Sequence, residues 1–479
     1  MRRSFQEWDA RVLVIGSGPG GSVTALHLAE AGWDVLLAEE GEHHAVGETE
    51  PYSNEEMDRK WRNGGLTPAF GPTTVTYVEG RCVGGASEIN AALYHPPLPE
   101  VLDAWRNEGR LADFGADALA PHVDWVEREV GVAPFPGGPG LASARLASGA
   151  RTLGWKSREV SRFWRYEQDA AGAWTGRRQS MTETLLPRAV AAGLRLVPGL
   201  RIRRLEFQGR RAVAAVGVDR DGRRVRIRFE KVFLCAGAVQ SALILRRSGL
   251  RRGVGDTLTL NPMVRVAARF DERVNEPERG VPVQQVEEFK PLMTLGCSHS
   301  SLPHLALWLV GPAAERERLL ADWPRMGVFY AKVSGKARGK VRSFPVTEEA
   351  FVRYAPTAED HANVAEALHR LGRLLFAAGA VEIVNPISGQ PPIRDGAGLD
   401  ELKRRMGGAA AQLTSIHLHS TVPMGQEAAG RPVDAWGKVH TFENVWVNDA
   451  SLMPDSPGIN PQGTVLAMAR RNVVRVLGG

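Results

Sequence analysis

The sequence predicts an α/β fold with two lobes, and three observations lead to this prediction. First, 479 residues with 43% apolar content are enough to bury a large core and to form more than one lobe. Second, residues 11–41 read as a strand, a glycine-rich turn, a helix and a second strand, which is the opening unit of an α/β sheet. Third, residues 264–270, 302–310 and 326–333 are apolar and β-branched, which indicates a separate antiparallel sheet.

The glycine-rich turn has the spacing of a dinucleotide-binding loop. Gly16 permits the tight turn, Gly18 lets the backbone approach a pyrophosphate, and Gly21 allows the helix to pack closely on the strand. About 20 residues further on, an acidic residue ends the second strand, where it is placed to accept a hydrogen bond from a ribose hydroxyl. Glu39 is the preferred candidate, and Glu40 is the alternative. A nicotinamide-dependent dehydrogenase shares this much, so the turn alone does not identify the cofactor.

The stretch from residue 416 to residue 461 contains the candidate catalytic groups. It opens with His417 and His419, and it ends with Asn460 in a Gly-Ile-Asn-Pro turn. A histidine with a pKa of about 6.5 accepts a proton at neutral pH, whereas an asparagine amide donates a hydrogen bond without titrating. Residues 445–447 read as a buried strand, and Asp449 follows it, where α/β folds place groups that face a ligand. This combination suits the oxidation of an alcohol.

Three segments together resemble the glucose-methanol-choline (GMC) family of FAD-dependent oxidoreductases. Residues 80–90, GRCVGGASEIN, are similar to the family segment GRxLGGSS, and residues 417–425, HLHSTVPMG, are similar to HPxGTxxMG. Residues 236–249, AGAVQSALILRRSG, are similar to AGAxxSPxLLxxSG. The chain departs from these patterns at Ala86, Ala242, Leu418, His419 and Ser420.

The resemblance implies a Rossmann-like FAD-binding domain and a discontinuous substrate domain built on an antiparallel sheet. The expected FAD-binding domain comprises residues 1–155, 190–262 and 425–479, and the substrate-binding domain comprises residues 156–189 and 263–424. Besides the glycine-rich turn and Glu39, the resemblance places these residues against the cofactor: Arg81, Gly84, Gly85, Ser87, Asn90, Ile202, Asp449 and Asn460. Family members with a covalent flavin carry a histidine where Ile89 stands, so we expect non-covalent FAD.

The resemblance also implies the reaction, which is transfer of a hydride from an alcohol carbon to flavin N5 to give a carbonyl. His417 would assist removal of the hydroxyl proton, and Asn460 would donate to the developing alkoxide. If this segment is a strand, the side chains of His417 and His419 point to the same face. His419 would then either touch the substrate or support His417. A non-redox lyase that cleaves carbon–carbon bonds and a flavin-binding protein without turnover are the alternatives.

The resemblance extends to the substrate class. The His-Leu-His variant is similar to sugar- and aminoglycoside-type alcohol oxidoreductases of bacterial secondary metabolism. The expected partners are therefore a small-molecule alcohol and an electron acceptor, either oxygen or another carrier.

Charge and composition argue against several other classes. The net charge is only +6, and the densest arginine cluster, at 201–228, alternates with apolar residues as in a solvated hairpin, which disfavours nucleic-acid binding. The chain shows neither an apolar run of 18 residues nor a secretory leader, so we expect a cytoplasmic protein without a membrane span. Cys82, Cys235 and Cys297 have neither metal nor disulfide spacing, and no metal site is expected.

The remaining segments are expected to be scaffold. Helical patterns begin at Glu100 and continue to residue 153, and a further helix covers residues 182–193. Thr357 and Asp360 have the spacing of a capping box, which starts a helix with one apolar face. Core or loop roles are expected for three further histidines: His95, His299 and His304.

Overall fold

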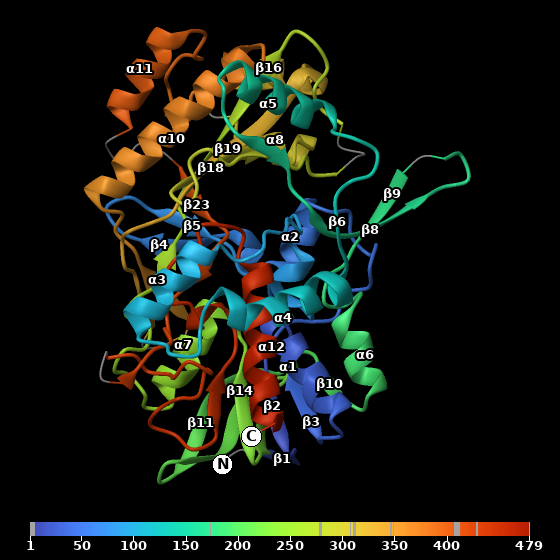
Figure 1. Ribbon diagram of the computed structural model, residues 1–479, viewed down its shortest axis with the longest axis vertical. Helices are drawn as coiled ribbons and strands as arrows, with labels where there is room; N and C mark the ends of the chain where they lie inside the picture. The colour runs from blue at the N-terminus through green and yellow to red at the C-terminus, as the bar shows by residue number, and fades with distance from the viewer. Residues whose placement is uncertain are drawn as a thin grey trace.

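The computed structural model describes residues 5–172, 174–276, 280–306, 308–309, 313–344, 347, 349–406, 412–427 and 430–478. Figure 1 shows two regions along the long axis, with a smaller sheet and its helices in the lower half and a larger sheet in the upper half. Both chain ends lie in the lower half. This mixed architecture confirms the predicted α/β fold class, with an antiparallel-rich sheet separate from the dinucleotide-binding unit.

The lower sheet is parallel throughout and has the strand order β10-β3-β2-β14-β25. Its strands are β2 (Val12–Ile15), β3 (Val35–Ala38), β10 (Arg195–Val197), β14 (Lys231–Leu234) and β25 (Val445–Val447). Every residue of β2, β3 and β25 is buried, as expected for strands covered on both faces. Helix α1 (Pro19–Glu30) packs on this sheet and against α12 (Gln462–Gly478). The two ends of the chain therefore complete one Rossmann-like unit.

A second small sheet in the lower half has the order β1-β13-β12-β11. Its strands are β1 (Gln6–Asp9), β11 (Arg201–Gln208), β12 (Arg211–Val218) and β13 (Arg224–Arg228). The predicted hairpin around Asp221-Gly222 is present as β12 and β13, and β11 adds a third strand by antiparallel pairing with β12. Arginines of this sheet pair with neighbouring carboxylates, as Arg226 does with Glu206 at 2.8 Å.

The upper sheet contains eleven strands in the order β20-β21-β4-β5-β23-β16-β19-β18-β17-β7, with β22 paired to β16. The strands are β4 (Thr67–Phe70), β5 (Val75–Tyr77), β7 (Ser157–Glu159), β16 (Met263–Phe270), β17 (Gln284–Val286), β18 (Met293–Cys297), β19 (Met326–Val333), β20 (Lys340–Ser343), β21 (Ala350–Arg353), β22 (Ala380–Ile383) and β23 (Leu413–Ser415). β16 and β19 pair antiparallel, which confirms the strands predicted at 264–270 and 326–333.

One strand predicted for this sheet is wrong. Residues 302–306 form helix α8 (Leu302–Ala306), and residues 307 and 310 of the predicted strand lie outside the described residues. Pro303 gives the reason, because proline lacks the N–H that a sheet ladder needs but fits the first turn of a helix. Leu305 therefore packs from a helix and is fully buried, whereas Leu302 at the start of that helix is exposed.

Helices α5 (Leu141–Thr152) and α10 (Ala358–Ala377) pack against each other and against the upper sheet. The predicted capping box is present at the start of α10, because the Asp360 N–H donates to Thr357 Oγ1 at 3.0 Å and the Thr357 N–H donates to Asp360 at 2.8 Å. Residues 67–77 and 141–152 thus lie with the upper sheet, although the predicted boundaries placed them in the FAD-binding domain. The remaining boundaries stay predictions.

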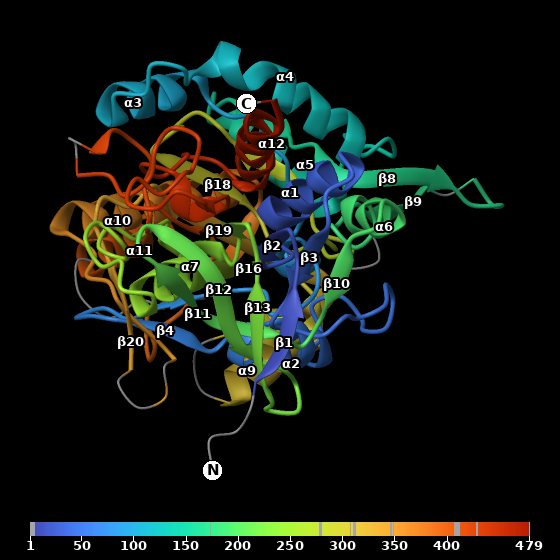
Figure 2. The same cartoon turned by 90° about the horizontal axis from the view of Figure 1, so that it is seen from below.

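The other elements connect or cover the two halves, and Figure 2 shows α3 and α4 as an outer layer beside α12. They are α2 (Asn54–Lys60), α3 (Pro99–Gly109), α4 (Ala116–Val126), β6 (Val132–Ala133), β8 (Arg162–Gln168), β9 (Trp174–Arg178), α6 (Leu185–Ala191), α7 (Gly237–Arg247), β15 (Thr259–Leu260), α9 (Ala313–Ala321), α11 (Gly396–Arg405) and β24 (Leu418–His419). Within the described ranges, no helix has the length and apolarity to cross a bilayer. The three cysteines are buried and unpaired.

Candidate active site

A cavity of about 330 Å³ lies where the turn after β2 and the end of β3 meet the upper sheet. One side, which we call the turn wall, consists of residues 15–20 and 38–40. The other, the sheet wall, consists of Met263, Arg265, Tyr330, Lys332 and His417. Residues more than 200 positions apart in the chain therefore border one space.

The glycines of the turn wall fit a pyrophosphate. A Cβ on Gly16, whose φ is +99°, would lie 2.5 Å from the carbonyl oxygen of Cys235. The predicted Gly21 does not line the cavity but packs closely within α1, where a Cβ would lie 1.8 Å from the carbonyl oxygen of Gly16. Gly18 differs, because no atom lies within 4 Å of an added Cβ there. Its backbone borders open space just before α1, whose first N–H groups favour an anion. The turn thus leaves a cradle that a phosphate group can fill.

Glu39 and Glu40 both line the cavity but have different partners. Glu39 accepts hydrogen bonds from the Ser17 N–H at 3.0 Å, the Ser17 hydroxyl at 2.7 Å and the Gly41 N–H at 2.8 Å. Burial raises the pKa of Glu39, and these hydrogen bonds oppose the rise. Glu40 instead pairs with three arginines: Arg62, Arg81 and Arg201. Burial raises its pKa, but Arg62 and the other arginines outweigh burial and lower it to about 2. Glu39 thus contacts neutral hydrogen-bond donors, whereas Glu40 contacts arginines.

The second glycine-rich segment reaches the cavity at some of the predicted positions. Gly85 and Asn90 line the cavity, and the Asn90 side chain donates to Gln462 at 2.6 Å. Gly84 and Ser87 lie behind them: the Gly84 N–H donates to the Ser17 hydroxyl at 3.0 Å, and the Ser87 hydroxyl donates to the Gly84 carbonyl at 2.8 Å. Arg81 does not line the cavity, and its guanidinium lies 3.3 Å from Glu40. These three residues therefore hold the segment in shape.

Two further residues that were predicted to contact the cofactor also line the cavity. They are Ile202 on β11 and Asp449 in the turn after β25. The Asp449 carboxylate accepts hydrogen bonds from the Ser241 hydroxyl at 2.6 Å and the Gly237 N–H at 2.9 Å. Burial raises the pKa of Asp449, and the hydrogen bonds oppose the rise. Its carboxylate thereby fixes the first turn of α7 beside the cavity.

His417 is buried in the sheet wall next to an asparagine that the sequence did not single out. His417 Nδ1 lies 3.4 Å from the Asn261 amide nitrogen, and the Asn261 amide oxygen accepts from the Ser456 hydroxyl at 2.8 Å. Exchanging the amide oxygen and nitrogen keeps both contacts, because the hydroxyl and the imidazole nitrogen can each donate or accept. With the amide oxygen toward His417, the ring proton sits on Nδ1 and leaves the lone pair on Nε2.

The surroundings keep His417 uncharged. Burial holds the pKa of His417 well below its usual value, and the positive charges of Lys332 and Arg265 act in the same direction. A neutral imidazole is the form that accepts a proton. Asn460 lines the same cavity, so the structure brings the two predicted catalytic residues to one space.

His419 has a different position. The cavity is lined by Ile416, His417 and Leu418 but not by His419, which is fully buried with Nδ1 3.4 Å from the Ser420 hydroxyl. Burial lowers its pKa to about 3. Of the two predicted roles, this position favours support of His417. His95 is likewise buried and does not line the cavity.

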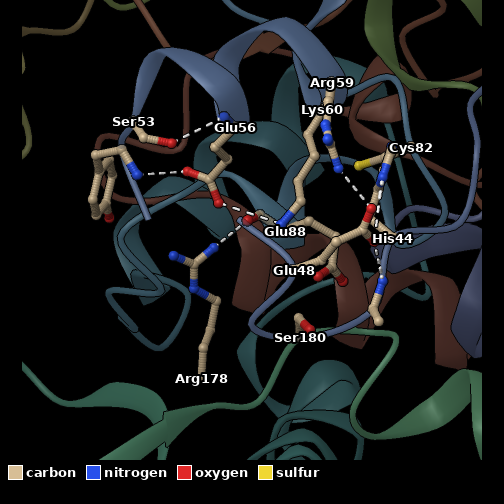
Figure 3. A network of polar contacts seen from close by, with 12 residues as sticks. His44, Glu48, Ser53, Glu56, Arg59, Lys60, Cys82, Glu88, Arg178 and Ser180 are labelled. Atoms are coloured by element: carbon tan, nitrogen blue, oxygen red, sulfur yellow. Dashed lines mark hydrogen bonds and ion pairs between the residues drawn. The ribbon is translucent and has the colours of Figure 1, made fainter. Parts of the chain in front are cut away.

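An aromatic group borders another part of the cavity. Tyr52 stacks on His299 with ring centroids 4.4 Å apart, and His304 approaches the same ring edge-on. Figure 3 shows Glu56 and Lys60 of this segment, whose carboxylate oxygen and Nζ lie 3.5 Å apart. Glu56 also accepts a hydrogen bond from the Tyr52 N–H at 2.7 Å. Burial lowers the pKa of His299 to about 4 and that of His304 to about 3. Within the described ranges, no three His, Cys, Asp or Glu residues form a metal-binding group.

The Rossmann-like sheet and the glycine-rich turn that lines the cavity indicate a dinucleotide-binding protein, and comparisons with known proteins narrow this class. Two GMC oxidoreductase family models match, over residues 57–263 and 337–469. A GMC-type oxidoreductase of Sinorhizobium fredii is 35% identical over 97% of this chain and 94% of its own length. The chain therefore belongs to the GMC oxidoreductase family and is an FAD-dependent alcohol oxidoreductase.

Two other proteins are similar at lower identity. Paromamine 6'-oxidase of Streptomyces fradiae is 28% identical over 98% of this chain and 91% of its own length. Among solved structures, pyridoxine 4-oxidase from Mesorbium loti has a TM-score of 0.76 and 20% identity, with 98% of this chain and 99% of that chain covered. The likeness to pyridoxine 4-oxidase shows that this chain shares its fold.

Sequence reasoning missed three groups of the site. Gly20 packs so closely that an added Cβ would lie 2.0 Å from the Asn448 carbonyl oxygen, and the sequence signal for it was present in the run of glycines. Asn261 carried no signal, because nothing in the sequence links it to His417. Lys332 and Arg265 carried a weak one, since each places a charge inside an apolar strand.

Proposed function

We propose that the protein oxidises the hydroxyl group of an alcohol to a carbonyl, with FAD bound non-covalently in the cavity. The observation that carries the proposal is a buried, neutral His417 in the same cavity as Asn460 and the glycine-rich turn. The turn wall, Glu39 and Asn90 would hold the cofactor. Bound FAD supplies the hydride acceptor at its N5 atom.

The side chains of the sheet wall handle the proton. His417 accepts the hydroxyl proton at Nε2 while the carbon–hydrogen bond gives up both of its electrons with the hydrogen. With its amide turned so that the oxygen faces His417, Asn261 would hold the ring proton of His417 on Nδ1. The Asn460 amide donates a hydrogen bond to the oxygen where negative charge develops. Burial of His417 keeps water from competing for these contacts.

The proposed substrate is a sugar-like alcohol in bacterial secondary metabolism. The likeness to paromamine 6'-oxidase and the His-Leu-His segment support this class. The polar side chains of the sheet wall, Tyr330 and Lys332, also suit a substrate with several oxygen atoms rather than an alkyl chain. Oxygen or another carrier would then take the electrons.

The test is anaerobic mixing of the flavin-loaded protein with a panel of alcohols. An alcohol substrate should bleach the flavin absorbance, and His417→Ala should slow this bleaching by about 10²–10⁴-fold, as for a lost general base. His361→Ala provides a matched control, because His361 lies in α10 and does not line the cavity. Unchanged absorbance across the panel would contradict the proposal and favour the non-redox alternatives.

The mode of cofactor attachment has its own test. Ile89 lines the cavity where family members with a covalent flavin carry a histidine, so heat or acid should release intact FAD from the precipitated protein. Yellow colour that stays with the polypeptide would contradict non-covalent binding.

A further inference from the structure

The sheet wall carries two positive side chains without an acidic partner. Lys332 in β19 and Arg265 in β16 both line the cavity, and Lys332 is only 3% exposed. The strand register explains why they share a face: Met263 lies opposite Lys332, Arg265 lies opposite Tyr330, and all four line the cavity. No carboxylate in the described ranges forms an ion pair with Lys332 or Arg265, and no carboxylate contributes to the pKa shift of either.

A neighbouring lysine, Lys290, does have an acidic partner. Lys290 is the other cation that acts on Lys332, and it has its own partner in Glu287. Glu287 also accepts from Arg158 at 2.8 Å. Glu287 is thus already paired with two cations, whereas Lys332 forms no ion pair with a carboxylate in the described part of the chain.

Arg265 and the strand beside Lys332 also have unused hydrogen-bonding capacity. Arg265 donates to the Thr414 hydroxyl at 2.9 Å and lies 5.0 Å from the Trp308 ring centroid, but its buried Nε has no partner among the described residues. Thr294, which lies opposite Lys332 on β18, has a buried hydroxyl that likewise finds no partner in the part of the chain that the structure describes. A buried polar group without a hydrogen-bond partner lowers the stability of the fold unless a ligand or a water molecule supplies that partner.

Burying the positive charges of Lys332 and Arg265 costs free energy, and a bound anion would offset this cost. Burial lowers the pKa of Lys332 to about 7 and that of Arg265 to about 10, because water no longer stabilises the charge. A negatively charged ligand would restore the stabilisation that the protein itself does not supply. The anion would sit at the catalytic end of the cavity, since Lys332 and Arg265 are both among the charges that act on His417.

We propose that the substrate carries an anionic group, a carboxylate or a phosphate, in addition to the hydroxyl that is oxidised, and that Lys332 and Arg265 bind that group. This inference rests on the proposed alcohol oxidation and narrows its substrate class. Within sugar-like alcohols it selects sugar acids or sugar phosphates, and it disfavours amino sugars, whose ammonium groups would face two like charges.

Two measurements on the flavin-loaded protein test the inference. In the first, hydroxy acids are compared with their methyl esters and with amino alcohols of the same length, and flavin reduction is followed without oxygen. In the second, the oxidised protein is titrated with benzoate and with phenyl phosphate, which carry no alcohol, and binding is read from the flavin absorbance. The second measurement needs no turnover, and its two arms distinguish carboxylate from phosphate.

Lys332→Met removes the charge and keeps most of the side-chain length. We expect it to weaken anion binding and to lower the ratio of kcat/KM for the hydroxy acid to kcat/KM for its methyl ester by about 10–100-fold, the range for a lost charged hydrogen bond. Lys332→Arg should restore most of the preference. Lys336→Met is the matched control, because Lys336 is an exposed lysine four residues further along.

The outcomes separate the two proposals. If no alcohol of any charge reduces the flavin but benzoate or phenyl phosphate binds in a Lys332-dependent way, the anion site stands and the proposed oxidation fails. If esters and acids react equally well in the parent protein, or if Lys332→Met slows both alike, the anion site is overturned and the proposed oxidation stands. Binding of anions that is equal in the parent and in Lys332→Met also overturns it.

Discussion

The turn wall and the sheet wall border the same cavity, but they present different chemistry to it. The turn wall offers backbone, since Gly18 leaves open space and its neighbours pack within 2.5 Å of other backbone atoms where a Cβ would be. The sheet wall offers side chains, with His417, Lys332 and Arg265 brought together from three strand regions. The turn wall works only if its glycines carry no side chain, because an added Cβ would strike backbone or fill the open space. The sheet wall works only if particular side chains are present. Substitutions should therefore affect cofactor binding at the first wall and rate or substrate choice at the second.

The largest expected effect is at the turn wall. Gly18→Val places a side chain in the open space beside the turn, so the protein should fold but fail to bind FAD. The ratio of flavin to protein absorbance measures binding, and circular dichroism measures folding. Gly396→Val is the matched control, because an added Cβ also meets nothing there and the site lies in α11. Full FAD content in Gly18→Val would show that the turn is not the cofactor site.

Asn460 also lines the cavity, and Asn460→Ala should leave FAD content normal and slow flavin reduction. The variant loses one donor to developing negative charge, which lowers the rate by about 10²–10³-fold. Stopped-flow absorbance measures the reduction, and FAD content is measured on the same sample. Loss of FAD in this variant would mean that Asn460 belongs with the cofactor-binding residues instead.

Asn261 should have a smaller effect that acts through His417. Asn261→Leu removes the contact with Nδ1 and should slow flavin reduction by about 10–100-fold, as for a lost supporting hydrogen bond. Asn261→Asp should recover part of the rate and move the acid limb of the pH–rate profile upward, because a carboxylate raises the pKa of the imidazole. If Asn261 were needed only for folding, Asn261→Asp would not change the pH at which the rate falls. An acid limb at the same pH as in the parent protein would therefore contradict the positioning role.

The smallest expected effect is on stability and concerns the buried imidazoles. Burial lowers the pKa of His299 to about 4 and those of His304 and His419 to about 3, whereas the unfolded chain binds these protons near pH 6.5. The unfolded state therefore takes up more protons as the pH falls below about 6.5, and the free energy of unfolding decreases down to about pH 3. Thermal melts between pH 8 and pH 5 should show a falling Tm. The fall should be smaller in His304→Phe than in His361→Phe, and equal slopes would contradict this account.

The two walls also differ in how far the sequence predicted them. Gly16, Gly18, Gly21 and Glu39 lie within one stretch of 24 residues, so their spacing already specified a strand, a turn, a helix and an acid. The strand at 302–310 was wrong for a similarly local reason, because Pro303 at the start of α8 outweighed the β-branched and apolar pattern. Local geometry depends on neighbours in the chain, and a sequence displays those neighbours directly.

By itself, the sequence determined the α/β class, the glycine-rich turn with its acidic residue, and the candidates His417 and Asn460. Only the tertiary structure decided that His417 lines the cavity and His419 does not, that Asn261 contacts the imidazole, and that Lys332 and Arg265 share its surroundings. The physical reason is that these relations depend on strand register and burial, which bring residues 261, 265, 332 and 417 together from separate segments. A register shift of one residue would turn Arg265 on β16 and Lys332 on β19 to the other face of the sheet, and no local pattern in the sequence records that choice.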